Sequence, residues 1–294
     1  MKKFIFYRLR RKLLVDGIKN EIVRDNYVRY LNYNYIYAQY KDFINNKTYG
    51  EISSKETKKI WVCWFQGLNN APDIVKLNFN KLKTTFTDYE VIMITEDNYH
   101  EYVNIPKYII DKFNDKIISY AHFSDILRVY LLCDIGGIWI DSTVLTTAKR
   151  MPDYIKSSKF FMFQEISLNR GDLPIVLGSS WFMKSNKDNP ILLLTKDLLC
   201  LYWQNTNVLI DYFLVHLFIS IAARKYHDLW NSMPIYNNIN PHIMQFELFN
   251  KYDKDRFMYY KSISDFHKLT YKFKKEDIHN ESNIAYILGD KYEK

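Results

Sequence analysis

From residue 60 onward, short apolar runs alternate with longer amphipathic runs, and this alternation limits the available folds most strongly. The expected strands are IWVCWFQG (60–67), YEVIMIT (89–95), GIWIDSTVLTT (137–147), KFFMFQE (159–165) and GSSWFMKS (178–185). Helices are expected at 121–133, 189–204 and 211–226. Strands that alternate with helices are typical of an α/β fold, in which helices flank a mainly parallel, Rossmann-like sheet. Such sheets bind ligands beyond the carboxyl ends of their strands.

The first part of the chain has a different character. Residues 3–45 contain no proline and only one glycine, Gly17, so we expect them to be mostly helical. The polar stretch at 45–59 marks a boundary. We therefore divide the chain into a basic helical extension, residues 1–55, and an α/β domain, residues 56–294.

Charge is concentrated in the extension. The net charge is +8, and residues 1–30 hold nine Lys and Arg against three Asp and Glu. A nucleic-acid-binding protein would carry its basic residues along a whole binding face, so we expect no nucleic-acid partner. Residues 1–30 fit either a solvated basic helix or peripheral contact with an anionic membrane, which attracts each Lys or Arg by about 1 kcal/mol.

Targeting signals and cysteines indicate the compartment. The first apolar run is interrupted by Arg8 and does not match a secretory signal, and no apolar run is long enough to span a bilayer. The cysteines Cys63, Cys133 and Cys200 are odd in number and widely spaced, which is typical of reduced residues in an intracellular protein. We expect a cytoplasmic protein, in peripheral contact at the inner face of the plasma membrane if the extension binds lipid.

The helix expected at 121–133 carries two charged residues in apolar surroundings. Phe123, Ile126, Leu127, Tyr130 and Leu131 form an apolar stripe at helical spacing. Asp125 and Arg128 are neighbours on the other side, where further apolar residues flank them. Buried charges need partners. Two interpretations stay open, a mutual salt bridge and a cavity in which both side chains bind a polar ligand.

The segment SDILRVYLLCDIGGIWIDST (124–143) resembles the signature of GT-A glycosyltransferases with a DXD sugar-binding region, a group that includes mannosyltransferases and clostridial glucosylating toxins. The strongest resemblance is to the capsular polysaccharide synthesis family. Its other hallmarks recur in order between residues 60 and 273, as IWVCWFQG, YEVIMIT, SSWFMKS, LIDYFLVH, INPHIMQ and FHKLTYK. This resemblance covers nearly the whole chain after the extension.

The resemblance implies a GT-A fold and a set of nucleotide-sugar-binding residues. Trp64 matches an aromatic residue that stacks on uracil, with a core tryptophan as the alternative, and Gln66 lies beside it. Asp125 and Arg128 match the pair that holds the donor sugar and diphosphate. The implied catalytic residues, which also bind the donor, are Asp141 and Asp211. Asp211 matches an acid beneath the transferred sugar and fits a helix N-cap equally well.

A divalent cation, Mn²⁺ or Mg²⁺, is the cofactor that the resemblance implies. Asp141 matches the first acid of D-x-D, and His267 matches a late histidine that completes the metal site in many such enzymes. Position 143 is Thr, where the pattern has a second Asp. Because these cations prefer carboxylate and phosphate oxygens, we expect Asp141, Thr143 and His267 to form a weak site that needs the bound donor.

The implied activity is transfer of a hexose from a UDP-Gal or UDP-Glc type donor to a glycan acceptor in capsular or exopolysaccharide synthesis. An undecaprenyl-linked glycan or an oligosaccharide is the expected acceptor, with retention of anomeric configuration. The main alternative is a non-catalytic nucleotide-sugar-binding or scaffold protein of a capsule assembly. A haloacid-dehalogenase phosphatase is disfavoured, because that class needs an Asp at position 143.

Overall fold

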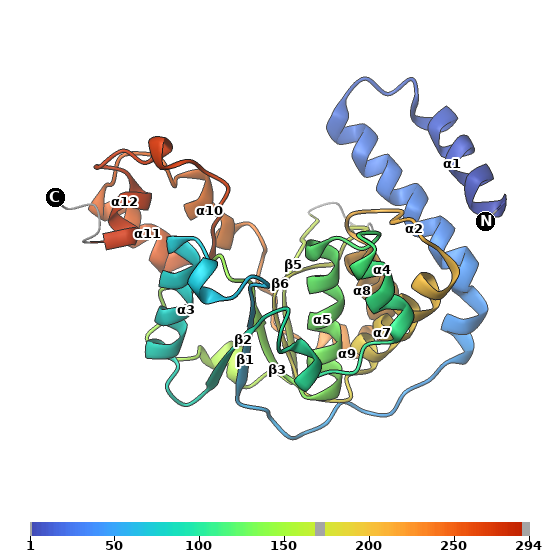
Figure 1. Ribbon diagram of the computed structural model, residues 1–294, viewed down its shortest axis with the longest axis horizontal. Helices are drawn as coiled ribbons and strands as arrows, with labels where there is room; N and C mark the ends of the chain where they lie inside the picture. The colour runs from blue at the N-terminus through green and yellow to red at the C-terminus, as the bar shows by residue number, and fades with distance from the viewer. Residues whose placement is uncertain (1, 168–173, 290–294) are drawn as a thin grey trace.

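The computed structural model describes residues 2–167 and 174–289. Its centre is a five-stranded sheet (Figure 1) in the order β2 (Glu90–Ile94), β1 (Lys59–Cys63), β3 (Gly137–Ile140), β6 (Gly178–Ser185) and β5 (Phe160–Gln164). Strand β1 pairs in parallel with β2 and β3, whereas β6 runs antiparallel to both β3 and β5. Four strands therefore share one direction, and the predicted α/β class with a mainly parallel sheet is confirmed.

The central strands are apolar on both sides because helices or strands cover both faces. In β1, Ile60 and Val62 belong to one core cluster, and Trp61 and Cys63 belong to another. Successive residues of a strand point to opposite faces, so each face of the sheet has its own core. The sequence shows this as an unbroken apolar run instead of a polar–apolar alternation.

One face of the sheet is covered by long helices. Helix α5 (Tyr120–Asp134) packs on β3 and β6, and α8 (Leu214–Lys225) packs on β6. Helices α7 (Pro190–Asn205) and α4 (Lys107–Asn114) complete the layer, with the short α9 (His227–Asn231) following α8. Figure 1 shows these helices together on one side of the sheet.

The other face carries α3 (Asp73–Thr85), the short α6 (Asp153–Lys156) and a two-stranded sheet of β4 (Val144–Thr146) and β7 (Phe266–Lys268). Three C-terminal helices pack beyond them: α10 (Asn240–Phe246), α11 (Lys254–Ile263) and α12 (Asn283–Leu288). They share an apolar cluster with α3, and Figure 1 places them beside that helix. The remaining short 3₁₀ turns are Leu68–Asn70, Tyr99–Glu101 and Lys275–Asp277.

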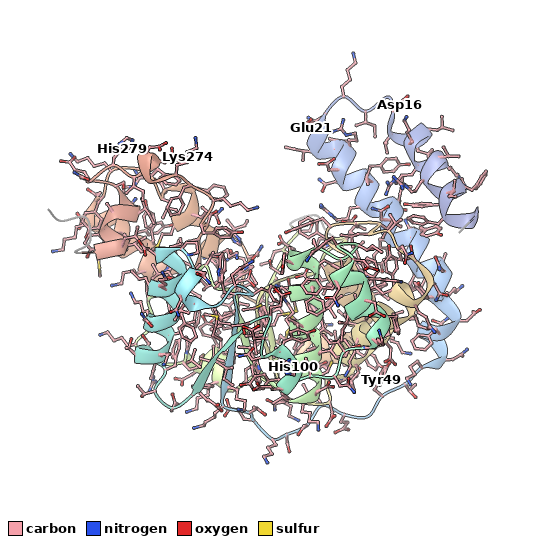
Figure 2. All side chains as sticks on the ribbon, viewed as in Figure 1. Asp16, Glu21, Tyr49, His100, Lys274 and His279 are labelled. Atoms are coloured by element: carbon pink, nitrogen blue, oxygen red, sulfur yellow. The ribbon has the colours of Figure 1, made fainter. Side chains whose placement is uncertain are left out.

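The N-terminal residues are mostly helical, as predicted, and they form a hairpin of two helices. Helix α1 (Lys2–Val15) and helix α2 (Glu21–Asn46) are antiparallel, and the Asn20 side chain caps α2 by accepting from the backbone N–H of Val23 at 3.1 Å. The far end of α2 packs on α8, while Asp16 and Glu21 lie at the projecting end of the hairpin (Figure 2). One end of the hairpin is thus anchored and the other extends from the body.

The prediction of a single strand over 137–147 is wrong. The chain forms two strands, β3 and β4, which belong to different sheets and are joined by a turn at residues 141–143. An apolar pattern cannot show where a buried run changes sheets, because both pieces are buried.

The glycine pair before β3 has a steric reason. Gly137 has φ +107°, and a Cβ there would lie 2.6 Å from the Lys59 carbonyl oxygen. Only glycine fits this backbone conformation and this close approach of two strands.

The described residues also show the state of the cysteines and the hydropathy of the helices. Cys63 and Cys133 are buried free thiols, and Cys200 is a half-buried one. Across residues 2–167 and 174–289, no helix has both the length and the apolar character that crossing a bilayer requires.

Candidate functional site

The turn at residues 141–143 lies at the carboxyl end of β3 and is held from three sides. The Asp141 N–H donates to the Trp181 carbonyl at 2.8 Å, and the Val144 N–H closes the turn onto the Asp141 carbonyl at 3.0 Å. The Asn78 amide of α3 donates to the Ser142 carbonyl at 3.3 Å. The end of a buried strand thereby presents the side chains of Asp141 and Thr143 in a fixed position.

Four charged side chains meet at this turn and are called here the acid–cation cluster: Asp125, Arg128, Asp141 and Lys268. The Arg128 Nη2 lies 3.1 Å from Asp125 Oδ1 and 3.3 Å from Asp141 Oδ1. The Lys268 Nζ lies 2.7 Å from Asp141 Oδ2. The mutual salt bridge of Asp125 and Arg128 is therefore present, and it is joined to the first acid of the D-x-D-like segment.

Arg128 is fixed by further contacts. Its Nη1 donates to the carbonyl and to the hydroxyl of Ser180, at 2.7 and 2.5 Å. Its guanidinium lies 4.8 Å from the ring centroid of Trp139, and the Trp139 Nε1 donates to Asp141 Oδ1 at 2.9 Å. Both Nη atoms are committed to protein partners, so Arg128 mainly holds the two acids in place.

Burial and charge act differently on the pKa values of the two acids. Burial raises the pKa of Asp125 to about 6, although the Arg128 guanidinium opposes this effect. Burial also acts to raise the pKa of Asp141, but Lys268 and Arg128 outweigh it, and the pKa lies below its ordinary value. Asp141 therefore stays ionised over the whole physiological range and keeps its two cations.

Two buried histidines next to the cluster are neutral. The Nε2 of His122 accepts from Trp203 Nε1 at 3.1 Å, so its Nδ1 carries the proton and lies 3.9 Å from Asp125 Oδ2. The Nε2 of His216 accepts from the Ser180 N–H at 3.3 Å. Burial, with a smaller effect of Arg128, lowers the pKa of each imidazole to about 3. The cluster thus contains two positive and two negative charges.

The residues predicted to bind the base lie after β1. Trp64 is half-buried, and its ring meets Tyr271 edge-on at 5.1 Å between centroids. It is therefore not a fully buried core tryptophan. Gln66 is exposed, and its backbone carbonyl accepts from the Asn70 side chain at 2.9 Å. No hydrogen bond or ion pair described for residues 2–167 and 174–289 joins either residue to the acid–cation cluster.

Asp211 faces the N-terminal hairpin. Its Oδ2 accepts from Asn32 Nδ2 of α2 at 2.8 Å, and its Oδ1 accepts from the Phe213 N–H at 2.9 Å. Helix α8 begins at Leu214, so Asp211 fixes the turn that leads into this helix. Its neighbour Tyr212 is largely exposed, and burial and the charge of Asp125 raise the pKa of the Tyr212 hydroxyl.

The structure does not bring His267 to Asp141 and Thr143. His267 is fully buried, and its Nε2 lies 3.1 Å from the Thr147 hydroxyl. Burial and the charge of Lys81 lower its pKa to about 4. The next residue, Lys268, points to the opposite face of β7 and lies 2.8 Å from Thr143 Oγ1. Within the described part of the chain, no three His, Cys, Asp or Glu side chains are placed to hold a metal ion.

Lys268 is the residue of the acid–cation cluster that the sequence analysis does not name. In the FHKLTYK segment the resemblance indicates His267, whereas the side chain that reaches Asp141 and Thr143 in the structure is that of the next residue, Lys268. In a strand, a shift of one residue changes the face. Strand β7 pairs with β4 in the register Val144 to Lys268, which sets Lys268 beside the turn. Recognising β7 as a strand paired with β4 would have found it.

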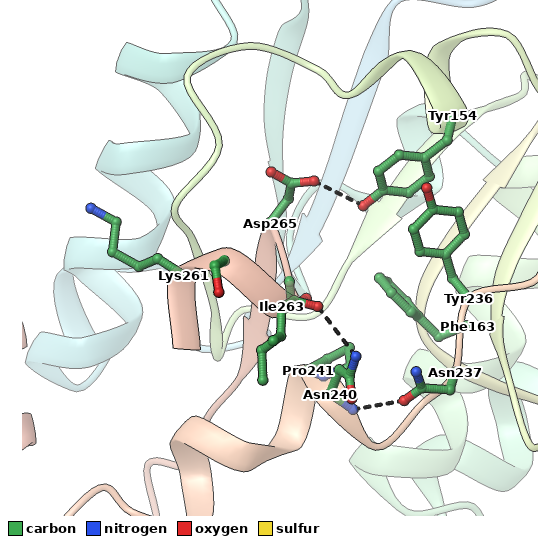
Figure 3. A pocket seen from close by; sticks show the side chains of 11 residues that line it. Tyr154, Phe163, Tyr236, Asn237, Asn240, Pro241, Lys261, Ile263 and Asp265 are labelled. Carbon is green, nitrogen blue, oxygen red and sulfur yellow. Dashed lines mark hydrogen bonds between the residues drawn. The ribbon is translucent and has the colours of Figure 1, made fainter. Parts of the chain in front are cut away.

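A separate cavity of about 250 Å³ lies between β5, α10 and α11 (Figure 3). Tyr154 and Tyr236 stack there at 3.9 Å between centroids, and the Tyr154 hydroxyl donates to Asp265 at 3.2 Å. None of the predicted site residues lines it. The candidate site is the acid–cation cluster, because it gathers the charged groups that the sequence pointed to.

Fold and site together define an α/β protein with a built polar site at the carboxyl edge of its sheet. The chain belongs to the capsular polysaccharide synthesis protein family, whose family model matches residues 12–287. No curated protein shows a sequence match to it. Among solved structures, it is similar to one titled PaToxG glycosyltransferase, with 18% identity, covering 89% of this chain and 97% of the other, at a TM-score of 0.40.

Proposed function

We propose that this protein is a glycosyltransferase that moves a hexose from a UDP-Glc or UDP-Gal type donor to a glycan acceptor. The observation that carries the proposal is the acid–cation cluster at the carboxyl edge of the sheet. Membership of a capsular polysaccharide synthesis family supports glycosyl transfer as the general activity. A nucleotide sugar combines hydroxyl groups, which suit carboxylate acceptors, with a diphosphate, which suits cations.

Each residue has a role in this proposal. Asp125 and Asp141 accept hydrogen bonds from the hydroxyls of the donor, and Arg128 fixes both carboxylates. The half-buried face of Trp64 offers a stacking surface for the uracil ring, with Gln66 beside it. Asp211 fixes the turn before α8 through the hydrogen bonds that it accepts from Asn32 and from the Phe213 N–H, and we place it beneath the transferred sugar, as the family resemblance implies. Transfer proceeds with retention of anomeric configuration, as the family resemblance implies.

A lipid-linked acceptor fits a feature of the N-terminal hairpin. The face of α1 that packs on α2 includes Tyr7, which stacks on Tyr35 at 4.0 Å. The opposite face exposes apolar side chains, namely Ile5, Phe6, Leu9 and Leu13. Arg8, Arg10 and Lys12 alternate with them. An exposed apolar stripe with basic residues is typical of a helix that lies in the surface of an anionic bilayer. We propose that the protein sits at the inner face of the plasma membrane, where an undecaprenyl-linked glycan is within reach.

The direct test is incubation with a panel of UDP-sugars, in Mn²⁺ and in EDTA, with released UDP as the readout. Donor hydrolysis by water reports the site without knowledge of the acceptor. UDP release from UDP-Glc or UDP-Gal is the expected result. The scaffold alternative predicts that a UDP-sugar binds in calorimetry but releases no UDP, with or without oligosaccharide or lipid-linked acceptors.

A further inference from the structure

The ammonium group of Lys268 bridges two of the residues that the resemblance assigned to a metal ion. Its Nζ lies 2.7 Å from Asp141 Oδ2 and 2.8 Å from Thr143 Oγ1. The backbone reinforces this placement, because the N–H of Leu269 donates to the Thr143 carbonyl at 3.0 Å. A cation bound to both side-chain oxygens would have to occupy the space that this ammonium fills.

The remaining ligand positions do not fit a divalent ion either. Asp141 Oδ1 already accepts from Trp139 and faces Arg128 at 3.3 Å, and Oδ2 faces Lys268. Each carboxylate oxygen therefore already faces a cation, which repels a metal ion but leaves Oδ2 able to accept a hydrogen bond from a hydroxyl. Thr143 offers a hydroxyl in place of a second carboxylate, and His267 lies on the other face of β7. The cluster has no net negative charge to attract Mg²⁺ or Mn²⁺, whose binding depends on anionic oxygens.

Lys268, unlike Arg128, keeps a hydrogen-bond donor that faces solvent. The Arg128 Nε has no hydrogen-bond partner either, but it is buried. The guanidinium is almost fully buried and its Nη atoms are bound to Ser180, Asp125 and Asp141. The side chain of Lys268 is 22% exposed, and its described partners take two of the three N–H donors of an ammonium. The cation that faces solvent at this turn is therefore the lysine.

We infer that Lys268 supplies the positive charge on the donor's diphosphate, so that donor binding and transfer need no divalent cation. This inference rests on the proposed function and departs from the metal ion that the family resemblance implies. In the transfer step, the bond from the anomeric carbon to the diphosphate oxygen breaks and its electron pair stays on that oxygen. The acceptor oxygen forms the new bond and loses its proton to solvent. Lys268 stabilises the negative charge left on the diphosphate by a charge-assisted hydrogen bond.

Calorimetry with UDP and the full chain tests the inference independently of turnover. The wild type is expected to bind UDP with nearly the same affinity in EDTA and in Mn²⁺. Lys268→Ala is expected to lower UDP affinity in EDTA by about 10- to 100-fold, the range for a lost hydrogen bond to a charged group. Lys268→Arg keeps the charge and should retain most of the affinity. Lys251→Ala, which removes an exposed lysine paired with Glu281, is the matched control and should change nothing.

Several outcomes overturn the inference. UDP binding that requires Mn²⁺ in the wild type contradicts it, and so does a Lys268→Ala variant that folds and binds UDP in EDTA as the wild type does. If UDP-sugars release UDP only with Mn²⁺, the proposed function stands and the lysine inference fails. If UDP binds without metal and through Lys268 but no donor turns over, the inference stands and the proposed enzymatic function fails.

A double variant tests whether a metal ion can bind in the position that the Lys268 ammonium fills. Thr143→Asp with Lys268→Ala restores two carboxylates at the turn and removes the ammonium between them. This variant is expected to bind UDP weakly in EDTA and at least about tenfold more tightly in Mn²⁺, because anionic oxygens now face the empty position. Equal affinity in both conditions would show that the ammonium does not stand where a metal would bind.

Discussion

The charged side chains at the carboxyl edge of the sheet have partners inside the protein, whereas the apolar side chains on the outer face of α1 point to solvent. Asp125, Arg128 and Asp141 are 14%, 7% and 23% exposed, although charged residues are rarely buried. Phe6 and Leu13 are 70% and 79% exposed, although apolar residues of this size are usually buried. The cluster buries charged side chains and α1 exposes apolar ones, so the two regions depart from the usual distribution in opposite directions.

The difference indicates how the two regions act. The charged groups of the acid–cation cluster are already held by ion pairs and hydrogen bonds before a ligand arrives, which suits recognition of a small, polar donor. The outer face of α1 leaves apolar side chains in contact with water, and burying them in a membrane surface would be favourable. Since the two regions lie on different elements, mutations should separate donor turnover from membrane binding.

The largest effect is expected for Asp141→Ala. This change removes the partner of Lys268, Arg128 and the Trp139 indole together, and loss of UDP release by about 10³-fold or more is expected, as for other electrostatic groups of active sites. Binding to anionic liposomes should stay unchanged. The matched control is Asp111→Ala, which removes an exposed acid paired with Lys107. Wild-type turnover in a folded Asp141→Ala protein would refute the assignment of the site.

Changes on α1 should have the reverse effect. Phe6→Glu combined with Leu13→Glu is expected to lower partition onto anionic liposomes by about 100-fold or more, since each apolar side chain contributes roughly 1.5–3 kcal/mol on burial. UDP affinity should stay at the wild-type value. Ile235→Glu with Phe246→Glu changes two equally exposed apolar residues elsewhere and serves as control. If both double variants partition like the wild type, α1 is a solvated helix.

Trp64→Ala should have a moderate effect confined to nucleotide recognition. Loss of stacking on the uracil ring is expected to weaken UDP binding about tenfold, within the usual range for a base on an aromatic side chain. Binding of inorganic diphosphate, which has no base, should not change. Trp64→Phe keeps a stacking surface and should recover most of the affinity. An equal loss for UDP and diphosphate would instead show that Trp64 acts by packing on Tyr271.

Much of the fold could be predicted from the sequence, because its signals are local. The runs of β1, β2, β5 and β6 are apolar over the length of a strand, and the helices α5, α7 and α8 are longer runs with helical spacing. The break between β3 and β4 could not be predicted in this way. The position of this break depends on which sheet each strand joins. Strand β4 pairs with β7, which lies about 120 residues further along the chain.

The candidate site was predictable in part for the same reason. Asp125 and Arg128 are neighbours on one helix, and Asp141 ends the strand that follows it, so local structure brings them together. Lys268 joins them only through the pairing of β7 with β4, a contact distant in sequence. The roles of Trp64, Gln66, Asp211 and Thr143 stay predictions until a ligand is bound.

The smallest effect is a pH-dependent change in stability at Asp125. Burial raises the pKa of this carboxyl in the folded protein to about 6, from 3.8 in an unperturbed aspartic acid. The folded state therefore keeps the proton while the unfolded state releases it, and the stability of the wild type falls as pH rises from about 4 to about 6. Asp125→Asn cannot ionise and does not lose this stability.

The measurement is the free energy of unfolding of both proteins from pH 4 to pH 7. The variant should match the wild type in free energy of unfolding near pH 4 and exceed it by on the order of 2–3 kcal/mol at pH 7. This value follows from a pKa of about 6 in the folded state against 3.8 in the unfolded state. Asp111→Asn removes one surface charge and controls for net charge. A constant difference across this range would mean that the ion pair with Arg128 fully compensates the burial of Asp125. Burial of Asp125 would then cost no free energy of folding, and the contrast between a buried charged cluster and an exposed apolar face on α1 would not reflect a difference in stability.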